Sequence, residues 1–351
     1  MNYASLKKRM CITIVCSIFM VGVIFNYVPQ AVSGPDVITW NVALWGGERD
    51  WTRPLHRWVD DMAKRTNGRW QIKLHYGSVL GPAKEHFDGI KAGLFEACQF
   101  CCSYAPGKTP LHSVHELPFI LPQDAQQISE LLVALWEHPA LLNELAKWKA
   151  VPLLPAALPQ DGLMSNKPIY KAEDFNGLRV RISGEQARVL TMFGAVPAMV
   201  PGPDMYEAME RGTIDALATP WPFAFGSFKI YEVSKYATPN FAPGSKCCAY
   251  VANRDAWNAL PEEFKKLHME WYKKAPKIWA EEYKKGHDKW IPIFKERGIE
   301  FIELSAEERG KLVSKAEIVY KDWINRMEKK KLPGKKVFDY FMAKRKEISG
   351  F

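Results

Sequence analysis

The chain has 351 residues, of which 47% are hydrophobic and 25% are charged. At roughly 150 residues per domain this length corresponds to about two domains, and the composition excludes long disorder, collagen and a multi-span membrane protein. The formal net charge of +9 belongs to the ends of the sequence, because residues 1–33 contribute +3, residues 262–351 contribute +7 and residues 34–261 contribute −1. The sequence contains neither a known nucleic-acid module nor basic residues interleaved with aromatics, so we expect no nucleic-acid partner.

The first 33 residues have the pattern of a secretory signal. Three basic residues at positions 7–9 precede an apolar stretch over about residues 10–28, and the small residues Ala31 and Ser33 follow in the −3 and −1 places of a cleavage site. We therefore predict a signal peptide over residues 1–33 and export to the periplasm. Because the apolar stretch is near the length of a membrane-spanning helix, an uncleaved membrane anchor is the alternative.

From residue 54 to residue 217 the sequence alternates between the period of an amphipathic helix and the period of a strand. The predicted elements, in chain order, are a helix over 54–66, a strand over 70–76, a helix over 82–92, a strand over 96–102, a helix capped by Asp124, a strand over 151–158, a strand over 178–182, a helix over 185–193, a strand over 198–200, a helix behind Asp204 and a strand over 214–217. Such alternation favours an α/β fold in which helices cover parallel sheets.

The last third of the chain changes to long helices with lysine-rich outer faces. Phe264 and Trp271 belong to one apolar helical stripe, and Pro276 breaks or kinks that helix. Ser305 and Glu308 form a capping box that starts a further helix. We interpret the positive charge of this region as a solvent-exposed face.

Removal of the signal peptide leaves five cysteines, which are Cys98, Cys101, Cys102, Cys247 and Cys248. They lie in two short, largely apolar, strand-like runs of a chain that is exported to an oxidising compartment. Buried thiols and a disulfide that joins the two runs both fit this setting. A metal site fits it less well, because zinc sites usually need a second pair of ligands in a polar setting.

No motif of an enzyme active site is found in the sequence. The nucleophile elbow, the phosphate loop, the dinucleotide fingerprint and His-Glu-x-x-His are absent. His112 and His115 are spaced like metal ligands but have no third partner, so we interpret them as surface or capping residues. We expect a protein that is not an enzyme and that uses no metal or other cofactor.

Two arginines stand on a predicted strand in the segment 177–184. Arg179 and Arg181 alternate with apolar residues, and Arg181 falls near the carboxyl end of the strand, where ligands of open α/β sheets bind. A guanidinium holds a carboxylate through two parallel hydrogen bonds, so Arg181 suits an acidic solute. The alternative is a structural arginine that pairs with an acidic side chain, and we favour this alternative for Arg179.

Six short motifs occur behind the signal peptide in a specific order and spacing. They are Asn67-Gly-Arg69, Gly77-Ser-Val-Leu-Gly81, Leu117-Pro-Phe119, Leu178-Arg-Val-Arg181, Met205-Tyr-Glu-Ala-Met-Glu-Arg-Gly-Thr-Ile-Asp215 and Ala256-Trp-Asn-Ala-Leu-Pro261. Together they resemble the extracytoplasmic solute-binding subunit of TRAP transporters, the dicarboxylate-binding-protein-like family, over nearly the whole mature chain. The resemblance implies a periplasmic protein that captures an organic acid and delivers it to the membrane permease subunits of a TRAP transporter.

The resemblance also implies a two-domain periplasmic binding protein fold with crossover strands and long C-terminal helices. We expect domain I over residues 34–158 plus about 247–286, and domain II over residues 159–246 plus about 287–351. We further expect a monomer. A binding protein of another importer or of a sensor shares these features and remains an alternative, and a secreted hydrolase is a weaker one.

The carboxylate-binding arginine of the family corresponds to Arg181. Thr219 stands where members that bind the best-known acids have asparagine, Gly202 stands where some members have phenylalanine, and the segment 160–165 lacks the second arginine of some members. These departures argue against a sialic-acid-like or dicarboxylate ligand. Aromatic residues near the expected cleft, Phe223 among them, indicate instead a monocarboxylate with an apolar or aromatic body. The expected ligand-binding residues are Arg181, Trp45, Tyr104, Thr219, Trp221 and Phe241.

Overall fold

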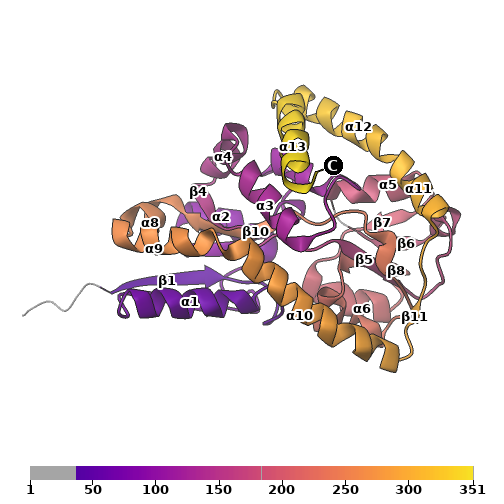
Figure 1. Cartoon of the computed structure of the whole chain (residues 1–351), viewed down its shortest axis with the longest axis horizontal. Coiled ribbons are helices and arrows are strands. Elements are labelled where there is room, and N and C mark those ends of the chain that lie inside the picture. Colours follow the sequence, from indigo (N-terminus) through magenta and orange to yellow (C-terminus); the bar gives the residue numbers. More distant parts are fainter. Residues whose placement is uncertain (1–36, 183, 351) are drawn as a thin grey trace, which may run out of the picture. The chain divides into compact units, whose positions relative to one another are not determined.

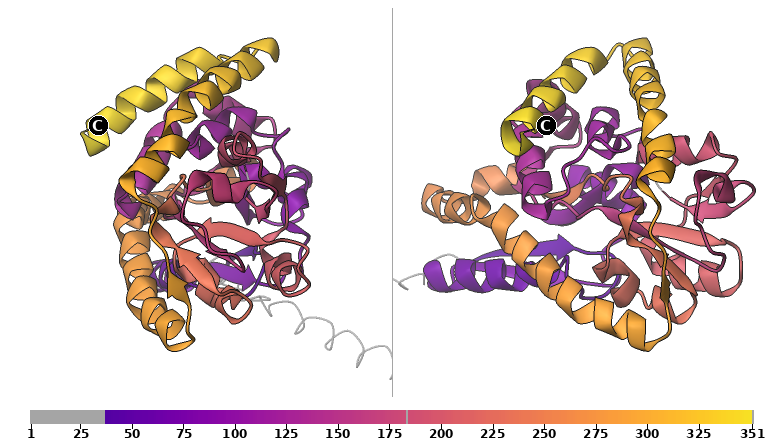
Figure 2. Two further views of the ribbon diagram at one scale, coloured as in Figure 1. Left: turned by 90° about the vertical axis from the view of Figure 1, so that its right-hand side faces the viewer. Right: turned by 45° about the vertical axis from the view of Figure 1, so that its right-hand side comes forward.

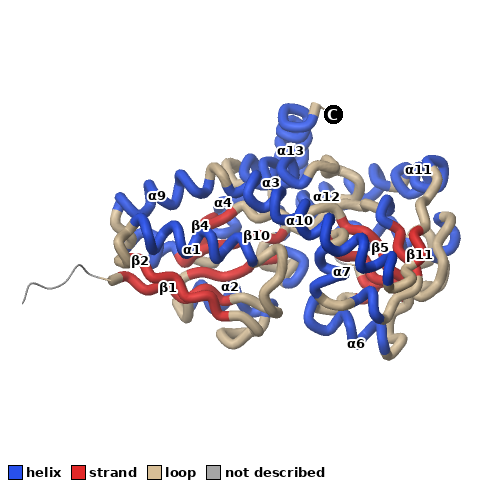
Figure 3. Tube along the Cα trace, turned by 60° about the horizontal axis from the view of Figure 1, so that its bottom comes forward, coloured by secondary structure: helices blue, strands red, loops and turns tan. Residues whose placement is uncertain are grey.

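The computed structural model describes residues 37–182 and 184–350 (Figure 1). The predicted signal peptide, residues 1–33, lies outside the described residues. In the described part of the chain, no helix is both long enough and apolar enough to cross a membrane. Two β-sheets with helices packed around them confirm the expected α/β class, and Figure 3 shows their strands as two separate groups.

The first sheet contains five strands in the order β2-β1-β3-β10-β4. Their bounds are β1 (Ile38–Ala43), β2 (Trp70–His75), β3 (Ala97–Cys101), β4 (Ala150–Leu154) and β10 (Cys248–Asn253). β1 runs parallel to β2 and β3, whereas β10 runs antiparallel to β3 and β4. The strand–helix alternation predicted parallel sheets, and this sheet is mixed, because the chain reaches β10 from the second sheet without the crossover helix that returns a strand in the parallel direction.

The second sheet contains six strands in the order β11-β9-β5-β8-β6-β7. Their bounds are β5 (Asp161–Ser165), β6 (Arg179–Arg181), β7 (Val196–Ala198), β8 (Ala216–Pro220), β9 (Tyr236–Thr238) and β11 (Glu300–Phe301). β6 is parallel to β7 and β8, while β5 is antiparallel to β8 and β9. β5 enters this sheet directly from β4 of the first sheet, which again gives a mixed sheet. The chain thus crosses between the sheets more than once, and the residue boundaries of the two domains stay a prediction.

Helices surround both sheets (Figure 2). They are α1 (Arg53–Arg65), α2 (His86–Ala92), α3 (Ala125–Leu135), α4 (Pro139–Ala146), α5 (Ala187–Thr191), α6 (Met205–Glu210), α7 (Phe223–Ser227), α8 (Arg254–Ala259), α9 (Glu262–Tyr272), α10 (Ala275–Glu296), α11 (Ala306–Ser314), α12 (Ala316–Lys329) and α13 (Gly334–Ser349). Pro276 separates α9 from α10 as expected, since it stands in the first turn of α10. Ser305 caps α11 by accepting a hydrogen bond from the backbone N–H of Glu308.

Helix α10 spans both halves of the structure (Figure 1). Trp279 and Tyr283 in its first half join the apolar core beside the first sheet, and Phe294 near its end joins the core beside the second sheet. The C-terminal α13 packs on α3. Helix α10 therefore carries the chain from β10 of the first sheet towards β11 of the second sheet and packs beside both.

The core beside the first sheet contains a histidine in a fixed tautomer. The Nε1 atom of Trp58 donates to Nδ1 of His268 at 3.2 Å, and Nε2 of His268 lies 2.9 Å from the carbonyl oxygen of Leu153. Both contacts require a neutral ring that is protonated on Nε2. Burial lowers the pKa of His268 to about 4, which keeps the ring neutral at physiological pH.

Candidate functional site

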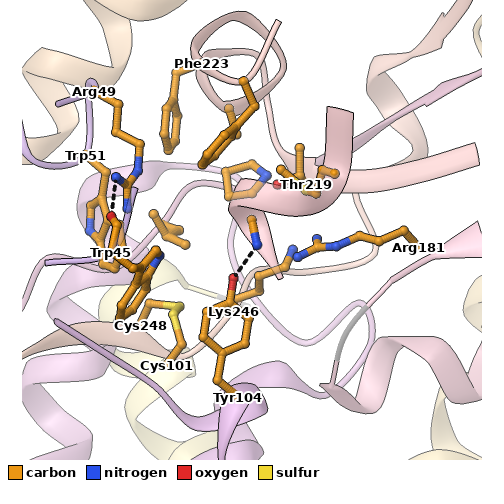
Figure 4. Close-up of a pocket in the computed structure, with 16 residues that line it drawn as sticks. Trp45, Arg49, Trp51, Cys101, Tyr104, Arg181, Thr219, Phe223, Lys246 and Cys248 are labelled. Atoms are coloured by element: carbon orange, nitrogen blue, oxygen red, sulfur yellow. Dashed lines mark hydrogen bonds between the residues drawn. A yellow bond between two sulfur atoms is a disulfide. The ribbon is translucent and has the colours of Figure 1, made fainter. Parts of the chain in front are cut away.

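A cavity of about 40 Å³ lies where residues from both sheets meet (Figure 4). This volume is below the range of small-molecule sites, which is about 300–1,000 Å³. Most of its lining is apolar or aromatic, and the charged groups are few. The lining residues are Trp45, Arg49, Trp51, Cys101, Tyr104, Leu158, Arg181, Gly202, Met205, Thr219, Pro220, Phe223, Ala224, Phe228, Lys246 and Cys248.

Aromatic rings form the walls on the side of the first sheet. Trp45 follows β1, and the centroid of its ring lies 5.6 Å from that of Trp51 and 5.4 Å from that of Tyr104. Phe223 adds a ring from α7 on the side of the second sheet. These walls can surround an apolar or aromatic body while excluding water from the charged groups.

Arg181 ends β6 and is 1% exposed. Its Nε donates to the carbonyl oxygen of Val200 at 3.0 Å, and its Nη1 donates to that of Ala218 at 2.8 Å. Neither contact neutralises the charge, and no carboxylate among residues 37–182 and 184–350 lies within ion-pair distance of Arg181. Backbone carbonyls therefore fix the guanidinium in place and leave its charge available to an anion in the cavity.

Arg179 stands two residues earlier on the same strand and has a different environment. Its Nε and Nη2 donate to the two carboxylate oxygens of Asp215 at 3.0 Å each. This ion pair raises the pKa of Arg179 and lowers that of Asp215. The structural role expected for Arg179 is the one observed.

A buried ion pair joins Lys246 to Asp161 at the edge of the cavity. Lys246 is 4% exposed, and its Nζ contacts Oδ2 of Asp161, which is 0% exposed. Burial raises the pKa of Asp161 and lowers that of Lys246, since each charge has lost its hydration. The charge of Arg181 acts on both groups, lowering both pKa values. Oδ1 of Asp161 is buried without a hydrogen-bond partner in the described structure.

Arg49 is a lining residue that the sequence analysis missed. It lies between β1 and α1, is 4% exposed, and its Nη1 donates to the carbonyl oxygens of Trp45 at 2.9 Å and Gly47 at 2.7 Å. Its guanidinium carbon lies 5.4 Å from the ring centroid of Trp51 and 5.6 Å from that of Phe228. Burial lowers its pKa. Arg181 could be recognised in the sequence because it stands near the end of a predicted strand. Arg49 lies in a loop, where no periodic pattern distinguishes it from other arginines.

Four of the six expected ligand-binding residues line the cavity, namely Arg181, Trp45, Tyr104 and Thr219, and Phe223 lines it too. Trp221 and Phe241 do not. β8 ends at Pro220, so the ring of Trp221 leaves the strand alternation and packs against Phe225, Phe294 and Phe301. Phe241 is fully buried against Phe175, with 5.6 Å between the ring centroids.

Tyr104 connects the two sides of the cavity. Its hydroxyl oxygen accepts a hydrogen bond from the backbone N–H of Gly202 at 3.2 Å, as Figure 4 shows. Tyr104 follows β3 of the first sheet, whereas Gly202 lies between β7 and α6 at the second sheet. This hydrogen bond therefore holds the two lining segments together.

A disulfide between Cys101 and Cys248 joins β3 to β10 and lines the cavity. The bridge between the two cysteine runs is thus one of the expected arrangements. Cys98, Cys102 and Cys247 are buried thiols, and burial raises their pKa values. Within the described residues no cluster of His, Cys, Asp and Glu is suited to a metal.

The interpretation of His112 and His115 as surface or capping residues was wrong. Both side chains are 0% exposed. Nδ1 of His112 lies 2.9 Å from a carboxylate oxygen of Glu144, which also accepts backbone hydrogen bonds from Leu111 and His112. Burial lowers the pKa of His115 to about 4. The proline-rich loop that carries them folds inward as a 3-10 helix over residues 110–116, which the sequence pattern did not reveal.

Comparisons with known proteins identify relatives of the chain. The family model described as bacterial extracellular solute-binding protein, family 7, matches residues 45–326. A monocarboxylate 2-oxoacid-binding periplasmic protein of Nostoc is 28% identical over 64% of this chain, and the match spans 63% of that protein, which is less than two thirds of its length.

Two solved structures have the same fold. A TRAP solute-binding protein from Rhodoferax ferrireducens, in complex with copurified benzoate, has a TM-score of 0.76 and 20% identity over 90% of this chain and 99% of its own. A TRAP periplasmic solute-binding protein from Bordetella bronchiseptica with bound (R)- and (S)-mandelate has a TM-score of 0.77 and 22% identity over 89% of this chain and 100% of its own. These similarities confirm the expected two-domain solute-binding fold.

Proposed function

The chain belongs to family 7 of the bacterial extracellular solute-binding proteins, and from this premise we propose that it captures an organic acid in the periplasm and delivers it to a TRAP-type transporter. The role is transport and involves no chemical conversion of the solute. The observation that carries the proposal is the buried guanidinium of Arg181, which faces an aromatic cavity and has no carboxylate partner in the described structure.

Capture proceeds by charge pairing and closure. The solute enters between the two halves and its carboxylate pairs with Arg181. Closure of the halves excludes water, and the ion pair strengthens because the local dielectric constant falls. The carbonyl oxygens of Val200 and Ala218 hold the guanidinium in place before the solute arrives, which reduces the entropy that binding must lose.

The body of the acid is apolar or aromatic, and we propose that it carries one carboxylate at Arg181. Rings of Trp45, Trp51, Tyr104 and Phe223 line the space beside the guanidinium. The benzoate and mandelate of the two structural neighbours and the monocarboxylate 2-oxoacids of the Nostoc relative support this class of ligand.

The loaded protein docks on the permease subunits, which complete the uptake step. A binding protein of another importer or of a sensor would capture the same acid with the same cavity. Genes for a large and a small permease subunit beside this gene distinguish the TRAP system from these alternatives. We propose a monomer as the working form.

A screen of organic acids by thermal shift, followed by calorimetry, tests the proposal. A ligand that binds only the folded state raises the melting temperature with the logarithm of its excess over Kd. In Arg181→Ala the Kd is expected to rise by about ten-fold or more, because a hydrogen bond to a charged group contributes roughly 1.5–3 kcal/mol. Arg179→Ala is the matched control, since that side chain lies on the same strand and pairs with Asp215. An unchanged affinity in Arg181→Ala refutes the role of Arg181.

A further inference from the structure

Arg49 is a second buried cation in the cavity whose charge is not neutralised. It is 4% exposed, and no carboxylate in the described part of the chain forms an ion pair with it. The carbonyl oxygens of Trp45 and Gly47 occupy Nη1, whereas Nε and Nη2 make no hydrogen bond with any described residue. A guanidinium does not lose its proton in a protein, so burial without an anion is unfavourable.

Nε and Nη2 form one edge of the guanidinium plane, and this edge suits an oxygen acceptor. Arg179 uses the same two nitrogens to bind the carboxylate of Asp215. In Arg181 the corresponding edge is partly occupied, because its Nε donates to Val200. Arg49 therefore offers two parallel donors to a group that enters the cavity.

The charges around the cavity also leave a place for a second acceptor. Lys246 and Asp161 neutralise each other, which leaves the charges of Arg49 and Arg181. A ligand with a single carboxylate at Arg181 pairs with only one of them. The charge count therefore favours a ligand with a second electron-rich oxygen.

The two guanidinium groups lie on opposite sides of the cavity (Figure 4). Arg49 comes from the loop after β1, and Arg181 comes from the end of β6. The rings of Phe223 on one side and of Trp45 and Tyr104 on the other flank the space between them (Figure 4). A ligand that reaches both groups therefore has polar atoms at its two ends and an apolar or aromatic middle.

On the premise of the proposed function, we propose that Arg49 is a ligand-binding residue that donates hydrogen bonds to a second oxygen acceptor, at the end of the acid opposite the carboxylate that pairs with Arg181. The class of ligand is then an aromatic or apolar acid with a hydroxyl or carbonyl group, and a second carboxylate in that place would replace the monocarboxylate proposed above by a diacid. A purely structural role for Arg49 is met by Nη1, which holds the loop, and by the contacts of the guanidinium with the rings of Trp51 and Phe228, and it leaves Nε and Nη2 without an acceptor.

Calorimetric titration of the purified protein with benzoate, 3-hydroxybenzoate and benzene-1,3-dicarboxylate tests this inference. The wild type is expected to bind at least one of the two substituted acids about ten-fold more tightly than benzoate. The tighter ligand is 3-hydroxybenzoate if Arg49 needs only a neutral oxygen acceptor, and benzene-1,3-dicarboxylate if Arg49 needs a charged one. In Arg49→Lys, which keeps the charge but loses the planar edge, this advantage is expected to fall to less than about three-fold.

The possible outcomes distinguish a failure of the role of Arg49 from a failure of the proposed ligand class. Equal affinity of the wild type for all three acids refutes the role of Arg49 and leaves the proposed capture of aromatic acids intact. A uniform loss of affinity in Arg49→Lys for all three acids also refutes it, because a structural role would act in that way. Absence of binding of all three acids by the wild type refutes both the proposed ligand class and this inference. Melting temperatures without ligand establish that the variant is folded.

Discussion

The buried ion pair between Lys246 and Asp161 gives the sharpest prediction for stability. Lys246→Met removes the cation and leaves a carboxylate that is 0% exposed and whose Oδ1 already lacks a hydrogen-bond partner in the described structure. Removal of one partner of a buried pair typically costs about 3–5 kcal/mol, because the other charge stays buried without compensation.

Two features of the site place the expected loss at the lower end of this range. The charge of Arg181 continues to act on Asp161. Burial also raises the pKa of Asp161, so its carboxylate can bind a proton instead of remaining charged. We therefore expect a loss of about 3 kcal/mol in the free energy of unfolding, which lowers Tm by roughly 4–5 °C, because the unfolding entropy of a chain of this length is about 0.7 kcal/mol/K.

Urea unfolding and thermal melts of the variant and a matched control measure the loss. Lys149→Met removes the partner of Asp255 in an ion pair at 3.1 Å whose side chains are 46% and 60% exposed, and it is expected to cost less than about 1 kcal/mol. The double variant Lys246→Met/Asp161→Asn should recover at least half of the loss, because neither side chain of the former pair then carries a charge. Equal losses in Lys246→Met and Lys149→Met would refute the reasoning.

Three further predictions follow from other contacts. Because the pKa of His268 is about 4 in the folded protein and about 6.5 in an unfolded chain, its contribution to stability is complete above pH 6.5 and is lost as the pH falls towards 4, by at most about 1.4 kcal/mol per pH unit. Urea unfolding measures how much the free energy of unfolding decreases between pH 7 and pH 5, and this decrease should be smaller in His268→Gln than in the wild type. The variant His287→Gln, which changes an exposed histidine, should show the same decrease as the wild type. An equal decrease in His268→Gln and the wild type would contradict the lowered pKa of His268. Tyr104→Phe removes a hydrogen bond between the two sides of the cavity and should weaken acid binding by about five-fold in calorimetry. Equal affinity of the variant and the wild type would show that this hydrogen bond contributes nothing to acid binding. The disulfide between Cys101 and Cys248 closes a loop with a sequence separation of 147, so the double serine variant should lose about 5 kcal/mol in urea unfolding, and a loss below 1 kcal/mol would contradict that role.

Local periodicity was enough to predict many elements of the fold. The expected helix over residues 54–66 is α1 at Arg53–Arg65, and the expected strand over 70–76 is β2 at Trp70–His75. β2 buries Trp70 and Ile72 and exposes Gln71 and Lys73, which is the alternation that the sequence contains. Strand direction could not be predicted in the same way, because it depends on which sheet the chain enters next rather than on the pattern within a strand.

The candidate site was predictable where a side chain lies on a regular element. Arg181 and Thr219 lie on strands, and their places in the cavity agree with their expected positions. Trp221 lies just beyond β8 and Arg49 lies in a loop, and there side-chain direction follows local turns that the sequence pattern does not encode. An aromatic residue near a strand end is therefore an unreliable indicator of a cavity position, since Trp45 and Tyr104 line the cavity and Trp221 does not.

The three arginines at or near the site show that the availability of a guanidinium matters more than its presence. Asp215 occupies the bidentate edge of Arg179, so that residue cannot bind a solute without breaking an ion pair. Asp161 lies close enough to influence Arg181, yet Lys246 holds its carboxylate. If Lys246 were removed, the carboxylate of Asp161 would lose its partner, and in its charged form it would compete with the carboxylate of the solute for Arg181. The buried ion pair thus stabilises the fold and at the same time keeps Arg181 available, so the single variant Lys246→Met should weaken acid binding and the double variant with Asp161→Asn should restore it.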